Sequence, residues 1–247
     1  MNTRLSFLVL LALLAASPCR AGVLEDMWAK YSPVEETVAG QASAPGRILG
    51  KPDREREAAF LYSWRYRAVT YELHYDEPAA LARTVYGIAL HAGDIDGTLA
   101  PERFIGGVLG YHYSTDQVCA WLNDVLDRKS PGPALDETVL VGMLLQDGII
   151  GITDGRFRTA GKIKHILAAA PGKKRQFDTN LRHERLHIFW DEDNAFREQG
   201  QEDWKNLSES ARAEALKKLA RYASGNEKQL IEEWAIARAE SSNMNME

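Results

Sequence analysis

Cysteine is scarce in this chain of 247 residues, which contains only Cys19 and Cys119. Cys19 lies in an N-terminal segment that we expect to be removed, so a disulfide within the remaining chain is excluded even in an oxidising compartment. We expect Cys119 to be a small core residue, because it lies on the apolar face of a predicted helix. Stability must then come from packing, and about 225 residues can bury one sizeable core or two small lobes.

Long apolar runs are absent after the N-terminal segment. No later stretch approaches the ~18 apolar residues of a membrane-spanning helix. Residues 1–21 are typical of a secretory signal peptide. Arg4 supplies the positive n-region, Leu5 to Ala16 the apolar region, and residues 19–21 a small-x-small cleavage site. We therefore expect an exported chain, periplasmic or secreted, that begins near Gly22 and has no membrane span.

Basic residues are too few to indicate a nucleic-acid partner. The chain has 30 Lys and Arg against 35 Asp and Glu. Loss of the signal segment removes Arg4 and Arg20 and no acid, which leaves 28 basic residues against 35 acidic ones and a net charge of −7. A serine hydrolase is also unsupported, since no GxSxG elbow occurs.

One motif stands out against these absences, the HExxH pentapeptide from His183 to His187. Residues four apart lie on the same face of a helix, so both imidazoles can reach one metal ion while Glu184 lies beside its open side. This is the pattern of a catalytic zinc site, in which the glutamate is the general base. N-cap residue types at 178–180 and an apolar stripe favour the helix; the stripe comprises Leu181, Leu186, Phe189 and Trp190.

A catalytic zinc needs a third protein ligand, and the last predicted helix offers Glu232 three residues before Ala235. At this point the chain resembles the gluzincin group of zinc metallopeptidases, in which a second helix supplies a glutamate, often in an ExxA setting. The resemblance implies that Glu232 is the third ligand of one Zn²⁺ and that the fold is zincin-like. Glu233 is the alternative on the same helix.

A second alternative for the third ligand is Asp193, six residues after His187, the spacing of metzincins with an aspartate ligand. The chain is otherwise unlike metzincins, because Trp190 stands where they need a glycine. The acids Asp191 to Asp193 are expected to form a solvated loop after the motif helix, with contact to a ligating histidine as the other interpretation. His112 and His165 are expected to be satisfied by local hydrogen bonds rather than to act in a site.

Hydrophobic patterns predict the other elements. We expect helices over 78–90, 115–128, 157–170, 207–223 and 226–240, and a strand over 66–75. Residues 138–145 and 149–153 fit either strands or a buried helix followed by a turn, and 104–113 an irregular strand or packed loop. Residues 22–56 read as an extended entry segment, and 94–98 as an Asx-rich turn.

These observations predict an α+β, zincin-like protein that is predominantly helical, with a small β-sheet and an HExxH active-site helix. We expect a single catalytic domain over residues 57–240, a candidate sub-boundary near 130–134, and a disordered tail at 241–247. The predicted function is hydrolysis of a peptide or protein substrate by an exported zinc metallopeptidase. The alternatives are a secreted binding or regulatory domain that keeps this fold without catalysis, and histidines with a structural role only.

Overall fold

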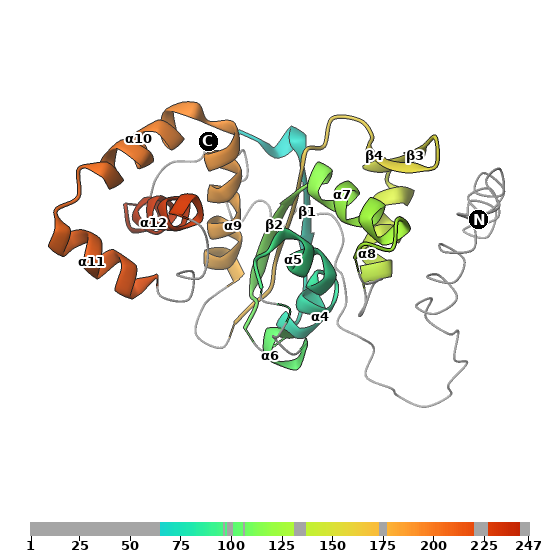
Figure 1. Cartoon of the computed structure of the whole chain (residues 1–247), viewed down its shortest axis with the longest axis horizontal. Helices are drawn as coiled ribbons and strands as arrows, with labels where there is room; N and C mark the ends of the chain where they lie inside the picture. Colours follow the sequence, from blue (N-terminus) through green and yellow to red (C-terminus); the bar gives the residue numbers. More distant parts are fainter. Residues whose placement is uncertain are drawn as a thin grey trace.

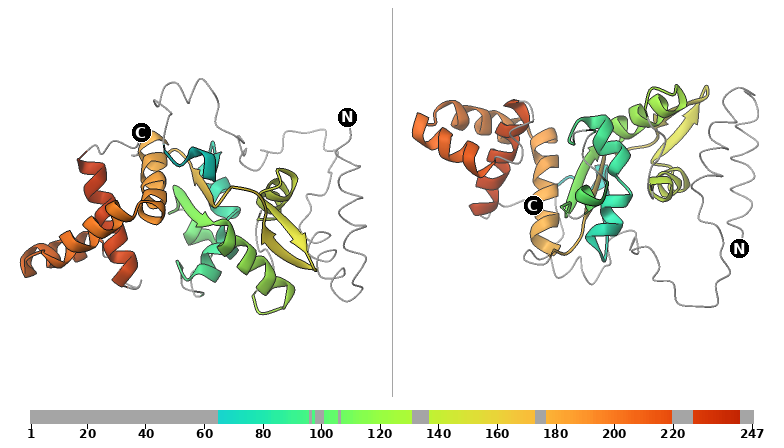
Figure 2. Two further views of the ribbon diagram at one scale, coloured as in Figure 1. Left: turned by 90° about the horizontal axis from the view of Figure 1, so that it is seen from above. Right: turned by 60° about the horizontal axis from the view of Figure 1, so that its bottom comes forward.

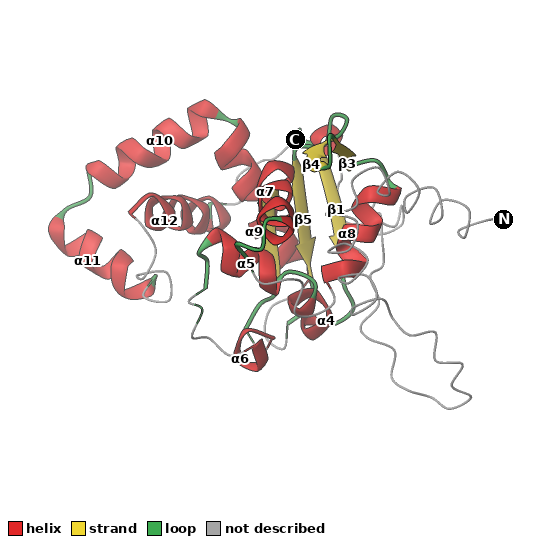
Figure 3. Ribbon diagram, turned by 45° about the vertical axis from the view of Figure 1, so that its right-hand side comes forward, coloured by secondary structure: helices red, strands yellow, loops and turns green. Residues whose placement is uncertain are grey.

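The computed structural model describes residues 65–95, 97, 101–105, 107–130, 137–172, 177–219 and 227–242. These residues form an α+β structure that is mostly helical, with a small mixed sheet and an antiparallel hairpin (Figure 3). The predicted α+β class is thus confirmed. The predicted signal peptide, the entry segment, most of the sub-boundary region and most of the C-terminal tail lie outside the described residues.

A three-stranded sheet lies at the centre of the molecule (Figure 1). Its order is β1 (Thr70–His74), β5 (His165–Ala169) and β2 (Gly110–Ser114), with β1 parallel and β2 antiparallel to the central β5. A separate hairpin joins β3 (Ile150–Thr153) to β4 (Arg156–Thr159). Its two turn residues, Asp154 and Gly155, both have positive φ, as the short type I′ connection requires.

Helices cover both faces of the central sheet (Figures 1 and 2). On one side lie α4 (Pro78–Arg83), α5 (Tyr86–Ala92), α6 (Pro101–Ile105), α7 (Thr115–Leu126) and α8 (Glu137–Gln146), after a 3₁₀ turn η1 (Arg67–Val69) that leads into β1. On the other side, α9 (Phe177–Glu192) lies directly against β5 and β2. Beyond α9 lie α10 (Asn194–Lys205), α11 (Glu209–Lys218) and α12 (Glu227–Ser241).

The two faces of the sheet differ in composition because successive side chains of a strand alternate in direction. On the face toward α4, α5 and α7, the main core contains Leu73, Tyr111 and Ile166. On the face toward α9, Leu167 and Ala169 pack in a second core with residues of that helix. His112 and His165 occupy alternate positions of β2 and β5 on this second face, which brings polar strand residues under α9.

A buried ion pair fixes α9 to the sheet. Arg185 donates through Nε and Nη2 to both carboxylate oxygens of Glu72 at 2.6–3.0 Å, and His74 Nε2 lies 2.8 Å from Glu72 Oε1. Burial by itself raises the pKa of Glu72, but the hydrogen bonds with His74 and Arg185 and the Arg185 charge outweigh it and hold that pKa below its usual value. Arg185 therefore anchors the motif helix from its sheet side while the histidines lie on another side.

Close packing at a glycine holds α10 against its neighbours. A Cβ placed at Gly200 would lie 2.8 Å from the Trp190 ring and 2.9 Å from Ala235 Cβ. Only a residue without a side chain allows α10 to approach both α9 and α12 this closely. The small residue Ala235 thus contributes to the position of α12 relative to α9.

The predicted helix over 157–170 is wrong, since this segment forms β4 and β5. All five residues of β5 are buried, and a strand covered on both faces reads as a continuous apolar run that resembles a buried helix. The expected single helix over 78–90 is two helices, interrupted at Thr84 and Val85. The expected loop at 191–193 is also wrong, because α9 continues to Glu192.

Other expectations agree with the structure in part. Helix α7 begins after Ser114, whose side chain accepts from the Gln117 amide in a capping box, and Cys119 is buried in its core face. Of the alternatives for residues 138–145 and 149–153, the first segment lies in helix α8, as in the helical alternative, but the second contains strand β3 rather than only a turn. Helix α10 was not expected, and α11 begins at Glu209 with Ser208 as its N-cap. Among the helices of the described segments, none has the length and apolarity needed to cross a bilayer.

Candidate metal centre

The motif helix forms as the sequence predicts. Helix α9 spans Phe177–Glu192 and carries His183 and His187 one turn apart, with ring centroids separated by 5.1 Å and ring planes at 82°. The side chains of His183 and His187 are 12% and 13% exposed to solvent. Both imidazoles are therefore largely buried yet still reachable from solvent.

Helix α12 brings a carboxylate to both rings. Glu233 Oε2 lies 3.6 Å from His183 Nε2, and Glu233 Oε1 lies 3.8 Å from His187 Nε2. One ligand atom from each residue lies within 4.8 Å of the others, close enough to hold one metal ion. We call His183, His187 and Glu233 the helical group.

The remaining ring nitrogens face two further carboxylates of α12. His187 Nδ1 lies 2.7 Å from Glu232 Oε1, and His183 Nδ1 lies 3.4 Å from Glu240 Oε1. The hydrogen bond with Glu232 fixes the tautomer of His187 and directs its Nε2 toward a metal, whereas the contact of His183 Nδ1 with Glu240 is not a hydrogen bond. Glu232, the residue expected to be the third ligand, thus contacts Nδ1 of His187, whereas Glu233 lies near Nε2 of both histidines.

Asp193, the remaining alternative for the third ligand, lies at the start of α10. Its side chain accepts from the Phe196 amide as an N-cap and pairs with Arg65 at 2.8 Å. The helical group does not include it.

The charges around His187 favour its protonated form in the absence of a metal. Burial alone would lower the pKa of this imidazole, but the hydrogen bond with Glu232 and the charges of Glu184, Glu232 and Glu233 raise the pKa of His187 to about 9. A site this rich in negative charge favours a cation in the place of the ring proton.

Glu184 is held tightly between α9 and the edge of the sheet. It is buried, and a Cβ at Gly110 of β2 would overlap its carboxylate. Glycine at 110 therefore provides the space that the carboxylate occupies.

Tyr113 of β2 is hydrogen-bonded and neutral. Its Oη donates to Asp94 Oδ2 at 2.6 Å. Burial, and after it the negative charges of Asp94 and Glu184, hold the pKa of Tyr113 well above its usual value, so it remains a neutral donor.

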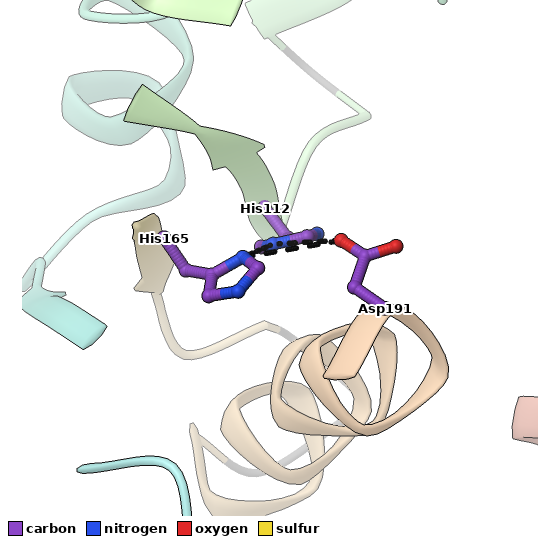
Figure 4. A group of neighbouring side chains, drawn as sticks. All are labelled: His112, His165 and Asp191. Atoms are coloured by element: carbon purple, nitrogen blue, oxygen red, sulfur yellow. Dashed lines mark hydrogen bonds and ion pairs between the residues drawn. The ribbon is translucent and has the colours of Figure 1, made fainter. Parts of the chain in front are cut away.

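A second histidine group lies where α9 crosses β2 and β5 (Figure 4). His112 Nε2 lies 3.0 Å from His165 Nδ1, and Asp191 Oδ2 lies 3.6 Å from the former atom and 3.9 Å from the latter. We call His112, His165 and Asp191 the interface group. Its three ligand atoms also lie within 4.8 Å of one another.

The two groups adjoin each other. The ring of His112 stacks on that of His187, with centroids 6.1 Å apart and planes at 14°. Burial, followed by the charges of His187 and His165, holds the pKa of His112 well below its usual value, which keeps this ring neutral at neutral pH. A neutral imidazole is the form that binds a metal.

Sequence reasoning did not find the interface group. The expected local hydrogen bonds of His112 and His165 are instead a contact between two strands, because the antiparallel register of β2 and β5 sets these residues diagonally on one face. One signal was available for Asp191, which follows His187 by four residues and therefore lies on the same face of the helix. Glu240 was likewise not expected near His183.

No protein-family model, curated protein or solved structure matches the chain.

Proposed function

We propose that this chain is an exported zinc metallopeptidase with a zincin-like fold, in which His183, His187 and Glu233 bind one Zn²⁺ and Glu184 is the general base. The observation that carries the proposal is the convergence of both Nε2 atoms on Glu233 beside the buried Glu184. The motif helix lies on a sheet with one antiparallel edge strand, β2, and this arrangement supports the zincin-like part of the proposal.

The donor set fits zinc. Two imidazole nitrogens and one carboxylate are the ligands of the gluzincin-type catalytic site, which leaves one position open for water or substrate. His187 has a carboxylate hydrogen-bonded to its second nitrogen, as ligating histidines commonly do. The second nitrogen of His183 lies 3.4 Å from Glu240 without a hydrogen bond. We assign Glu233 as the third ligand and Glu232 as the residue that orients His187.

The residues of this site have distinct tasks. When bound, zinc supplies a Lewis acid that acidifies a water ligand and polarises a carbonyl. Glu184 takes the proton of the attacking water and passes it to the leaving amine, while Gly110 leaves the space that positions its carboxylate. Tyr113 stays neutral because burial, and after it the charges of Asp94 and Glu184, raise its pKa, and its hydroxyl donates to Asp94.

Strand β2 supports an extended peptide as the substrate class. It pairs with β5, is one of the two edge strands of the described central sheet, and runs beside α9. An edge strand offers main-chain groups to which an extended peptide can add as a further strand. Gly110, against Glu184, lies at one end of this strand, so such a peptide would pass the general base.

The direct test is cleavage of a quenched fluorescent peptide library by the mature chain and by Glu184→Gln. We expect the variant to lose cleavage by about 10²–10⁴-fold while it retains zinc. Glu198→Gln, an exposed position on α10, is the matched control and should cleave like the wild type.

Two results would contradict the proposal. Cleavage by Glu184→Gln at the wild-type rate would remove Glu184 from the mechanism. A wild-type chain that holds zinc and cleaves neither the library nor unfolded proteins would instead favour a binding domain without catalysis.

A further inference from the structure

The interface group has the donor set and the spacing of a metal site of its own. We propose that His112, His165 and Asp191 bind a second divalent cation of the zinc class, separately from the helical group. The proposal does not depend on peptidase activity. It depends on three ligand atoms from three different elements that meet at one point (Figure 4).

The distances are close to those that a tetrahedral ion requires. Zinc lies about 2.0–2.1 Å from nitrogen and oxygen ligands, so the ligand atoms of a tetrahedral site are about 3.3 Å apart. In the interface group they are 3.0, 3.6 and 3.9 Å apart. Side-chain shifts of about half an ångström suffice to reach the ideal geometry.

One neighbouring contact directs a lone pair of His165 into the group. Its Nε2 lies 3.0 Å from Glu192 Oε1, and Lys164 Nζ holds the same carboxylate at 3.0 Å. The ring proton of His165 is therefore placed on Nε2, and Nδ1 presents its lone pair to His112 and Asp191. The carboxylate–histidine pairing that supports the helical group thus recurs here.

The surroundings give rigidity on one side and access on the other. His112 and His165 lie on paired strands, and their side chains are largely buried. Asp191 comes from the last turn of α9, and 43% of its side chain is exposed. An ion can enter past Asp191 and be held by side chains that the sheet has already placed.

A simpler account is that His112 donates to His165 Nδ1 and that no metal binds. This account explains the 3.0 Å contact, but it gives Asp191 no role. The two accounts therefore differ in what Asp191→Asn does to metal binding. Two imidazoles and a carboxylate select zinc and its neighbours Co²⁺, Ni²⁺ and Cu²⁺ over Mg²⁺ or Ca²⁺.

The test is titration of the full mature chain with Zn²⁺ by calorimetry after the helical group has been disabled with His183→Ala and Glu233→Gln. We expect this double variant to bind one equivalent of Zn²⁺ with micromolar or tighter affinity. The added change Asp191→Asn should weaken binding by at least tenfold, and His165→Ala should abolish it. His91→Ala, which changes a histidine that pairs with Asp124 on other elements, is the matched control and should have no effect.

Circular dichroism of each variant shows whether it is folded. If the double variant is not folded, zinc is counted in the wild-type chain and in single Asp191→Asn, whose altered side chain is partly exposed. Two equivalents of zinc in the wild type and one in Asp191→Asn would support the proposal. A folded double variant that binds no Zn²⁺, or an equivalent count that Asp191→Asn leaves unchanged, would overturn it. If the helical group does not bind zinc, His183→Ala will retain as much metal as the wild type. This result is distinguishable from failure of the interface group to bind zinc.

Discussion

The helical group and the interface group each join two histidines to one carboxylate, but their histidines are brought together in different ways. His183 and His187 lie one turn apart on α9, so helix geometry alone places them on one face. His112 and His165 are 53 residues apart and meet only because β2 pairs antiparallel to β5. The comparison shows that the histidine pair of the helical group is encoded by local spacing, whereas that of the interface group is encoded by the topology of the sheet.

Both groups depend on the docking of α9 on the sheet, and the largest expected effect breaks that docking. Arg185→Met leaves Glu72 as a buried charge without its cationic partner, and we expect a loss of about 3–5 kcal/mol in the free energy of unfolding. Chemical denaturation measures it. Arg158→Met, at an exposed position of β4, is the matched control. A loss equal to that of the control would show that the ion pair does not anchor the helix.

The roles of the two adjacent glutamates of α12 can be separated by zinc affinity. Glu232→Gln should weaken zinc binding at the helical group by about 10–100-fold, since it removes only the carboxylate that orients His187. Glu233→Gln should weaken it by more, because it removes a ligand. Competition with a zinc chelator measures both. The reverse order would make Glu232 the third ligand, as the resemblance to gluzincins implies.

The position of the general base depends on a residue of the sheet rather than of the helix. Gly110→Ala inserts a Cβ where the Glu184 carboxylate lies, and a displacement of about 1 Å can reduce the rate by about 100-fold. We therefore expect Gly110→Ala to lose peptide cleavage while it retains zinc. Gly151→Ala, where the nearest side chain is 3.7 Å from the added Cβ, is the control. Equal cleavage by both variants would refute a positioning role for Gly110.

The smallest expected effect is on protons. Because the pKa of His187 is raised to about 9, the metal-free chain holds a proton on His187 at pH 7.5 that zinc must displace. Calorimetry in buffers of different ionisation enthalpy should detect about one proton released from this residue.

The proton on His187 also affects the stability of the metal-free chain. The positive charge of His187 stabilises the fold fully below about pH 6.5, and this contribution is lost as the pH rises through about 9. Stability of the metal-free chain that does not fall across this range would contradict the assignment.

The sequence predicted those parts that follow from local spacing. The motif helix and the burial of Cys119 depend on neighbours within a few residues, and each is as expected. The helix expected over 157–170 failed because burial on both faces of β5 hides the strand period. The interface group could not be predicted because its register depends on strands distant in the chain.

The choice between Glu232 and Glu233 shows the same limit at the scale of one turn. Their spacing from Ala235 gave the resemblance to gluzincins, but the rotation of α12 against α9 decides which carboxylate faces the Nε2 atoms. That rotation is fixed in part by Gly200 of α10, which packs against Ala235. Contacts among three helices therefore decide a question that the spacing along one helix leaves open.

Zinc binding by the helical group is tested most directly by native mass spectrometry of the purified chain from Gly22 onward, beside His187→Ala and the control His91→Ala. We expect zinc in the wild type and in His91→Ala, and one equivalent fewer in His187→Ala. Zinc content that is equal in all three proteins, or no zinc in any of them after zinc has been supplied, would contradict the account.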